Sequence, residues 1–94
     1  MSTYQGWTNY ETWCVALWLD NEQGSYDYCV ELAKDLDGDT YALSERLKEM
    51  HEEAAPEVTG VFADLQNAAL AAVNWRELAE HYEGVVRDNE ELSA

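Results

Sequence analysis

Apolar residues recur along this chain at intervals of three and four positions, and no stretch alternates apolar with polar residues for long enough to indicate a strand. The clearest case lies near the N-terminus, where the spacing i, i+3, i+4, i+7, i+8 is occupied by Tyr10, Trp13, Cys14, Leu17 and Trp18. This spacing places all five side chains on one side of an α-helix. We therefore predict a helix whose aromatic side faces the core of the protein.

Start and stop signals divide the rest of the chain into further helices. Residue types that cap helix N-termini precede three of the apolar stripes, namely Thr8 (in a capping box with Glu11), Ser25 and Asn74. A third helix is expected over roughly 40–54, and the stripe of a fourth consists of Val58, Val61, Phe62, Leu65, Ala69, Ala72 and Val73. We predict an all-α protein, a small compact bundle of four to five short helices. It forms a single acidic domain over residues 1–94, with an N-terminal arm at 1–8 and a frayed C-terminus at 88–94.

Composition decides whether such a chain folds at all. It has 10 Leu, 7 Val, 1 Phe and no Ile, which is 18 of 94 residues, and a net charge of −15; these values are typical of disordered chains. Four Trp and six Tyr reverse this expectation, because each large aromatic side chain can bury ~150–250 Å². We therefore expect Trp13, Leu17 and Trp18 in the core. Tyr4 and Trp7 precede the first helix, and we expect them either to pack back onto it or to form an exposed aromatic contact for a partner.

The balance of 20 Asp and Glu against 5 Lys and Arg limits the classes of partner. Binding to DNA or RNA requires clustered cations that neutralise phosphates, and anionic lipid surfaces make the same demand. No apolar run approaches the ~20 residues of a membrane span, and residues 1–11 lack the layout of a signal peptide. We expect a soluble, cytoplasmic protein that binds neither nucleic acid nor membranes directly.

No motif for catalysis or for metal binding is present. Cys14 and Cys29 lack Cys-x-x-Cys spacing and are expected to be reduced and buried, with a disulfide between the first two helices as the open alternative. The acidic repeat at 35–39 lacks the glycine and the Glu that an EF-hand loop needs at its sixth and twelfth positions, and it indicates a turn instead. His51 and His81 stand alone on expected helix surfaces. We predict that the protein is not an enzyme and carries no cofactor and no metal.

The acidic residues themselves form rows at helical spacing. Three rows are predicted: Asp27, Glu31 and Asp35; Glu45, Glu49, Glu52 and Glu53; and, more loosely, Glu77, Glu80 and Glu83. Carboxylates on one side of a rigid helix can present a field comparable to that of nucleic-acid phosphates, which suits the basic groove of a nucleic-acid-binding protein or nucleoprotein complex. Like charges four residues apart destabilise a helix by roughly a few tenths of a kcal/mol, so stability alone does not favour this placement.

Adaptation to concentrated salt explains the same composition. A chain with two lysines against 20 acidic residues is expected where salt screens the repulsion and hydrated carboxylates maintain solubility. In that case the chain is a non-enzymatic interaction or structural module. Composition alone does not separate this alternative from mimicry of nucleic acid, and it leaves the oligomeric state open, a homodimer included.

Two segments of the chain are similar to a known group of proteins. Residues 4–21, which contain the pattern Gly-Trp-x-Asn-x-Glu-Thr-Trp, resemble the N-terminal signature of small uncharacterised acidic proteins of tailed phages, plasmids and archaeal or bacterial genomes. Residues 74–82 resemble the start of the C-terminal helix in the same proteins. The two segments cover under a third of the chain.

The resemblance implies a biological context and assigns no functional residues. Accessory proteins of mobile elements include inhibitors of restriction and CRISPR systems, and many such inhibitors are short, acidic and mimic DNA. Together with the acidic rows, this leads to one hypothesis, an anti-defence protein (anti-CRISPR or anti-restriction) acting in the host cytoplasm. Such a protein would bind a nucleic-acid-processing complex of the host and block its nucleic-acid binding.

Overall fold

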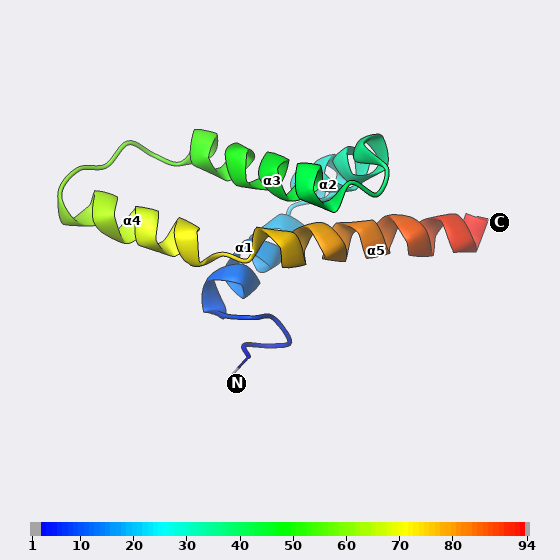
Figure 1. Cartoon of the computed structure of the whole chain (residues 1–94), viewed down its shortest axis with the longest axis horizontal. Coiled ribbons are helices and arrows are strands. Elements are labelled where there is room, and N and C mark those ends of the chain that lie inside the picture. The colour runs from blue at the N-terminus through cyan, green and yellow to red at the C-terminus, as the bar shows by residue number, and fades with distance from the viewer. Residues whose placement is uncertain (1–2, 94) are drawn as a thin grey trace.

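The computed structural model describes residues 3–93 of the chain, and its side chains up to Glu90. It contains five helices: α1 (Tyr10–Asn21), α2 (Gln23–Leu36), α3 (Thr40–Ala54), α4 (Val61–Ala72) and α5 (Trp75–Ser93) (Figure 1). An isolated backbone bridge between Tyr4 and Trp7 is the only β-type pairing in the described part of the chain. The all-α prediction is therefore confirmed. Helix α5 continues to Ser93, through most of the segment 88–94 that was expected to fray; residues 1–2 of the predicted arm and residue 94 lie outside the described part.

Helix α5 is the centre of the bundle. It packs along α3 in the antiparallel direction and also contacts α2 and α1 (Figure 1). Helix α4 lies at one end of the molecule and the C-terminal part of α5 at the other, so the molecule measures 52 × 31 × 24 Å. Among the described residues, no helix is both long and apolar enough to span a membrane.

The core is formed mainly by small and medium-sized side chains of α1, α2, α3 and α5. Its largest member is Tyr82, whose ring is fully buried. The buried apolar residues are Ala16, Leu19, Cys29, Val30, Ala33, Leu43, Leu47, Val73, Leu78, Ala79 and Tyr82. Helix α4 contributes none of them.

The start of α1 is held by a half-buried polar residue. Asn9, and not Thr8, caps the helix: its Oδ1 accepts hydrogen bonds from the backbone N of Thr12 at 2.9 Å and from the Thr12 hydroxyl at 2.6 Å. The Asn9 side-chain amide donates to the carbonyl oxygen of Ala72 at 2.7 Å. The predicted capping box of Thr8 and Glu11 is therefore wrong, because Asn9 also reaches the end of α4 and Thr8 is engaged elsewhere.

The start of α5 is tied to the same residues. Asn74 caps α5 as predicted, since its Oδ1 accepts from the backbone N of Glu77 at 3.1 Å. Its own backbone N donates to the Thr12 hydroxyl at 2.8 Å, and its side-chain amide donates to the Thr8 hydroxyl at 3.3 Å. The backbone N of Thr8 in turn donates to Oε1 of Glu77 at 3.0 Å. The two segments singled out in the sequence, 4–21 and 74–82, thus form one interlocked pair of helix caps.

This pair of caps decides which side of α1 faces inward. Helix α1 buries Thr12, Ala16 and Leu19, and leaves Trp18 71% and Leu17 39% exposed. The predicted aromatic stripe is therefore largely on the outside, and the placement of Trp18 and Leu17 in the core was wrong. Thr12 lies on the side opposite this stripe, so its hydrogen bonds to Asn9 and Asn74 direct the rings outward.

The connections between α1, α2 and α3 are short. Helix α2 begins at Gln23 after the single extended residue Glu22, so the predicted cap at Ser25 is wrong because that residue already lies in the first turn of the helix. The predicted turn at 37–39 is confirmed: Asp37 adopts the left-handed conformation that ends α2, and Oδ1 of Asp39 accepts from the backbone N of Ala42 at the start of α3.

Helix α4 differs from the other four. Gly60, at φ 64°, caps its start, so the helix begins at Val61 and Val58 lies in the preceding loop. None of its residues is buried, and α1 is its main neighbour. The predicted fourth stripe therefore does not face the core, and of its seven members only Val73, after the helix, is buried. The physical reason is the cap at Asn9, which anchors α4 by its last turn and leaves its first turns beyond the bundle.

Candidate functional site

The first predicted acidic row lies on the outer side of α2. Asp27, Glu31 and Asp35 are all exposed, opposite the side on which Cys29 and Ala33 are buried. The carboxylate of Asp27 accepts from the side-chain amide of Gln23 at 2.9 Å, and Glu31 lies 3.6 Å from the ammonium of Lys34. Both contacts lie within the helix and at the surface, so the row stays available to solvent.

The second row lies on the outer side of α3. Glu49, Glu52 and Glu53 are exposed and Glu45 is half-buried, while the opposite side of the helix buries Leu43, Ser44 and Leu47. Oε2 of Glu49 lies 3.7 Å from Nη1 of Arg46, and both side chains are about half exposed.

The two rows adjoin across the α2–α3 contact. A shallow depression of about 60 Å³ is lined by Tyr28 of α2 and by Arg46, Glu49, Met50 and Glu53 of α3. Glu49 and Glu53 therefore lie beside α2. We call the exposed sides of the two helices the α2–α3 acidic surface, which consists of Asp27, Glu31, Asp35, Glu45, Glu49, Glu52 and Glu53.

The third row is used within the molecule. Glu77 accepts from the backbone N of Thr8, Glu80 lies 3.0 Å from Nε of Arg76, and Glu83 accepts from the hydroxyl of Thr40 at 2.8 Å. The three carboxylates thus engage the N-terminal arm, α5 itself and α3. They do not extend the α2–α3 acidic surface.

The aromatic residues of the N-terminal arm pack against the bundle. Tyr4 and Trp7 exchange two backbone hydrogen bonds of 2.8 Å around a tight turn. The ring of Trp7 packs against the core and meets His81 edge-on, with ring centres 5.2 Å apart. Tyr4 contacts the rings of Tyr10 and Trp13 and keeps 39% of its surface exposed. Of the two predicted alternatives for Trp7, packing back onto the protein is therefore the one that the structure shows.

A polar cluster that joins α1 and α5 was not predicted from the sequence. The hydroxyl of Tyr82 donates to Oδ1 of Asp20 at 2.8 Å, and Nε2 of His81 lies 3.5 Å from the other carboxylate oxygen. His81 is half-buried here and is not the isolated surface residue that was predicted; no local spacing signals this contact, because Asp20 lies 61 positions away.

His51 is likewise more enclosed than predicted. Its Nδ1 lies 2.8 Å from the carbonyl oxygen of Leu47, and its ring packs against Trp75 with centres 5.1 Å apart. Both contacts fix the imidazole within the α3–α5 packing. Both histidines therefore lie in contacts with side chains of other helices.

The buried thiol of Cys29 and the buried phenol of Tyr82 both have raised pKa values. Burial, and secondarily the charge of Asp20, raises the pKa of the Cys29 thiol to about 11, so it is protonated at neutral pH. Burial and the hydrogen bond to Asp20 also raise the pKa of Tyr82. Cys29 is fully buried and Cys14 half-buried, and both are free thiols. The predicted reduced state holds, although Cys14 is only partly covered.

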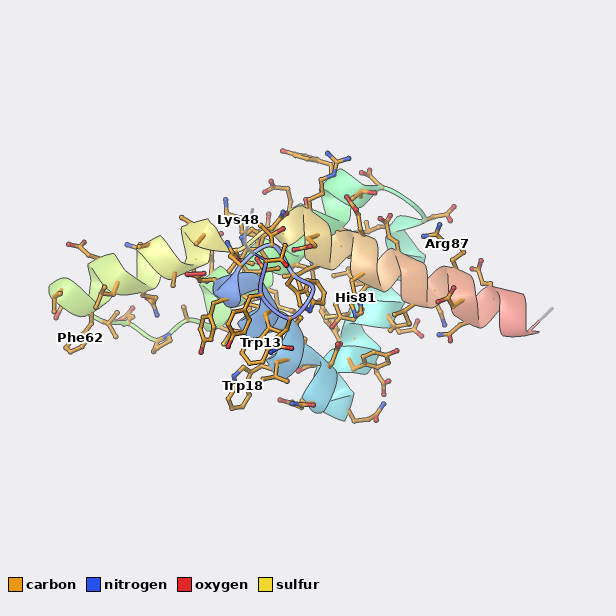
Figure 2. The ribbon with its side chains drawn as sticks, turned by 90° about the horizontal axis from the view of Figure 1, so that it is seen from below. Trp13, Trp18, Lys48, Phe62, His81 and Arg87 are labelled. Carbon is orange, nitrogen blue, oxygen red and sulfur yellow. The ribbon has the colours of Figure 1, made fainter. Side chains whose placement is uncertain are left out.

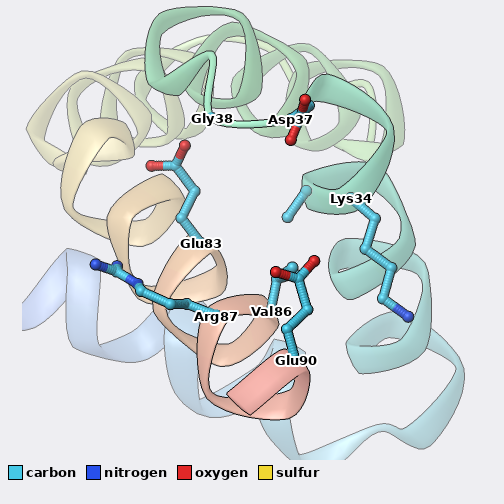
Figure 3. Close-up of a pocket in the computed structure, with 8 residues that line it drawn as sticks. Lys34, Asp37, Gly38, Glu83, Val86, Arg87 and Glu90 are labelled. Carbon is cyan, nitrogen blue, oxygen red and sulfur yellow. The ribbon is translucent and has the colours of Figure 1, made fainter. Parts of the chain in front are cut away.

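A cavity of about 330 Å³ lies between the end of α2 and the second half of α5 (Figure 3). It is lined by Ala33, Lys34, Asp37, Gly38, Glu83, Val86, Arg87 and Glu90. Figure 3 shows the side chains of Lys34 and Arg87 extending to opposite sides, away from each other. The cavity thus presents no converging set of cations for an anionic ligand. Within the described residues, no group of three or more His, Cys, Asp or Glu side chains is arranged to hold a metal ion.

Comparison with known proteins places the chain in a family. Residues 1–90 match the family described as a "Family of unknown function (DUF7249)", so the chain belongs to that family. The match includes both of the segments that form the paired helix caps. Neither the curated proteins nor the solved structures gave a match.

Proposed function

For this member of DUF7249, we propose a non-enzymatic inhibitor that covers the basic groove of a nucleic-acid-processing complex. Its biological role is that of an anti-defence protein, anti-CRISPR or anti-restriction, which acts in the cytoplasm of the host. The α2–α3 acidic surface carries the proposal, since it combines seven carboxylates on two packed helices.

The carboxylates of this surface are poorly neutralised. Among the described residues, Asp35, Glu45, Glu52 and Glu53 form neither a hydrogen bond nor an ion pair through their side chains. The ion pairs of Glu31 and Glu49 are exposed and three residues apart, a class of contact that contributes ~0–1 kcal/mol. A partner that supplies lysine or arginine side chains would therefore gain charge-assisted hydrogen bonds that the free protein lacks.

The charge is also distributed unevenly along the molecule. Residues 58–75 carry Asp64 as their single charged side chain, so the remaining residues account for −14 of the total charge of −15. The acidic helices α2, α3 and α5 pack on one another, whereas α4 lies at one end (Figure 1). This asymmetry supports electrostatic steering of a basic partner toward the part formed by α2, α3 and α5 and away from α4, with association that slows steeply as salt is added.

A cleavage assay tests this proposal. Purified CRISPR effector complexes and restriction endonucleases are assayed for DNA cleavage with the chain in excess, and we expect inhibition of at least one that competes with DNA. The double variant Glu49→Lys and Glu53→Lys should abolish this inhibition. A matched control, Asp88→Lys and Glu90→Lys, changes two exposed carboxylates of α5 outside this surface and should retain inhibition.

Both variants raise the net charge by four, from −15 to −11, so a difference between them reports position and not total charge. Inhibition that survives in the first variant, or that is lost equally in both, contradicts mimicry by the α2–α3 acidic surface. Lack of inhibition of any nuclease in the panel counts against the anti-defence role itself.

The salt-adapted module is the second candidate, and one observation favours it. Acidic side chains occur on all five helices, and among the residues that the structure describes each of the three ion pairs to Lys or Arg joins residues of the same helix. Acidity that serves solubility in concentrated salt predicts that the protein unfolds at low ionic strength and refolds in molar salt. A thermal melt that is unchanged between these conditions contradicts this second candidate.

A further inference from the structure

The outer side of α4 is an apolar surface that no residue in the described part of the chain covers. Val61, Phe62 and Leu65 are 63%, 68% and 60% exposed, and Ala68 and Ala69 beside them are also exposed. We call these five residues the α4 outer face. Figure 2 shows the side chain of Phe62 extending away from the helix at the end of the molecule.

The partly buried side of α4 is a different one. Ala63, Gln66 and Leu70 are half-buried, and the side-chain amide of Gln66 donates to the carbonyl oxygen of Pro56 at 3.3 Å. The helix therefore turns its alanine and glutamine side toward the protein and its bulkiest apolar residues toward solvent. An amphipathic helix in a monomer has the opposite orientation, and exposed apolar patches of this kind mark interaction sites.

We propose that a second copy of this chain covers the α4 outer face, with the two α4 helices antiparallel about a two-fold axis at Leu65. The face has bulky residues in its first half and alanines in its second. An antiparallel pair centred on Leu65 therefore places Phe62 of one copy against Ala68 of the other, and Val61 against Ala69. Each large side chain then meets a small one, as a self-complementary two-fold interface requires.

Charge favours the same occupant. Two chains of net charge −15 repel each other, so they can meet only where charge density is lowest, and residues 58–75 contain a single charged side chain. Because α4 lies at one end of the 52 Å axis, pairing through it keeps the α2–α3 acidic surfaces of the two copies out of the interface. A basic partner would instead be steered toward the α2–α3 acidic surface. The two surfaces are separate, and this proposal does not depend on the inhibitor role.

The expected dimer is weak and strengthened by salt. Two paired helices of 12 residues, each ~18 Å long, bury less than the ~800 Å² per partner of a standard interface, so we expect a dissociation constant in the micromolar range. Raising the salt from about 50 mM to about 500 mM NaCl should tighten the dimer by tenfold or more, because it screens the repulsion between the copies.

Sedimentation velocity of the full chain across protein concentration tests the proposal. The mass should rise from 10.7 kDa toward twice that value as concentration increases, and more readily at high salt. Leu65→Glu should weaken the dimer by at least about tenfold, since it places a carboxylate at the two-fold axis. The matched control Tyr41→Glu adds the same charge at a 75% exposed position on α3 and should leave the dimer intact. Circular dichroism checks that both variants fold.

Cross-linking tests the antiparallel register. In a Cys14→Ser background, Phe62→Cys mixed with Ala68→Cys should form a disulfide between the two chains under oxidation, whereas Tyr41→Cys mixed with Ala68→Cys should not. A monomer at every concentration and salt overturns the proposal, as does a dimer that Leu65→Glu leaves unchanged. If Leu65→Glu abolishes binding to a different protein while the wild type stays monomeric, the α4 outer face belongs to that other partner and the proposal is wrong.

Discussion

Replacing Thr12 by valine tests the interlocked caps of α1 and α5. The substitution conserves shape and removes the hydroxyl, which is fully buried, donates to Asn9 Oδ1 at 2.6 Å and accepts from the backbone N of Asn74 at 2.8 Å. The partly buried N–H of Asn74 then loses its acceptor. An unsatisfied buried donor costs about 1–3 kcal/mol, and the lost bond to Asn9 adds to this, so we expect a destabilisation of about 2–3 kcal/mol.

Thr12→Ser is the matched control. It keeps the hydroxyl and removes one buried methyl group, which typically destabilises by about 0.5–1.5 kcal/mol. Urea unfolding followed by tryptophan fluorescence gives both free energies, and thermal melting should show a decrease of about 10–20 °C for the valine variant.

The order of the two Thr12 variants is the decisive result. Burial of apolar surface alone ranks valine above serine at a fully buried position, whereas the hydrogen-bond network ranks serine above valine. A double-mutant cycle of Thr12→Val with Asn9→Ala should show a coupling of about 1 kcal/mol or more, because the two side chains share a bond. A valine variant as stable as the wild type, or a coupling near zero, would refute the account of the paired caps.

Three further predictions follow from the core and from α4. Because burial raises the pKa of Cys29 to about 11, the folded state keeps its thiol proton longer than the unfolded chain. The contribution of Cys29 to stability is therefore full below the ordinary thiol pKa. It is lost as pH rises toward 11, by about 1.4 kcal/mol per pH unit for one proton. Urea unfolding at pH 8–11 measures this loss, and Cys29→Ala should flatten the dependence of the unfolding free energy on pH. Tyr82→Phe removes the hydroxyl that donates to the Asp20 carboxylate and should destabilise the protein by about 1–2 kcal/mol in the same assay. The loss is smaller than for a fully buried charged pair because water reaches Asp20. An unchanged midpoint of urea unfolding contradicts this interpretation. In Gly60→Ala the added methyl group meets no atom within 4 Å, but alanine must adopt a φ of 64°. This strain should destabilise the protein by about 1–3 kcal/mol and unwind the start of α4, which circular dichroism detects as lower helicity. Full helicity would show that the loop adapts.

The helices could be located from the sequence, and the faces that they bury could not. Apolar spacing and the cap at Asn74 are local signals, and they identified all five helices. The predicted burial was wrong for Trp18 and for the stripe of α4, because side-chain size does not decide which side of these helices faces inward. The inward face of α1 is decided by Thr12, whose partner at Asn74 is 62 positions away.

The candidate surfaces were likewise predicted only in part. The rows at 27–35 and 45–53 each share one side of a helix, as their spacing predicts, and all members but the half-buried Glu45 are exposed. In the third row, Glu77 and Glu83 accept hydrogen bonds from Thr8 and Thr40, which lie 69 and 43 positions away in the sequence. The α4 outer face could not be foreseen either, since its apolar periodicity is that of a core helix.

The sequence by itself thus determined which segments are helical and where acidic residues share a side, because both properties depend on neighbours within one or two turns. Only the tertiary structure decided which helix sides are covered and which carboxylates are already paired. Those outcomes depend on hydrogen bonds between residues some sixty positions apart, such as the 2.7 Å bond from Asn9 to Ala72, and no local pattern specifies them.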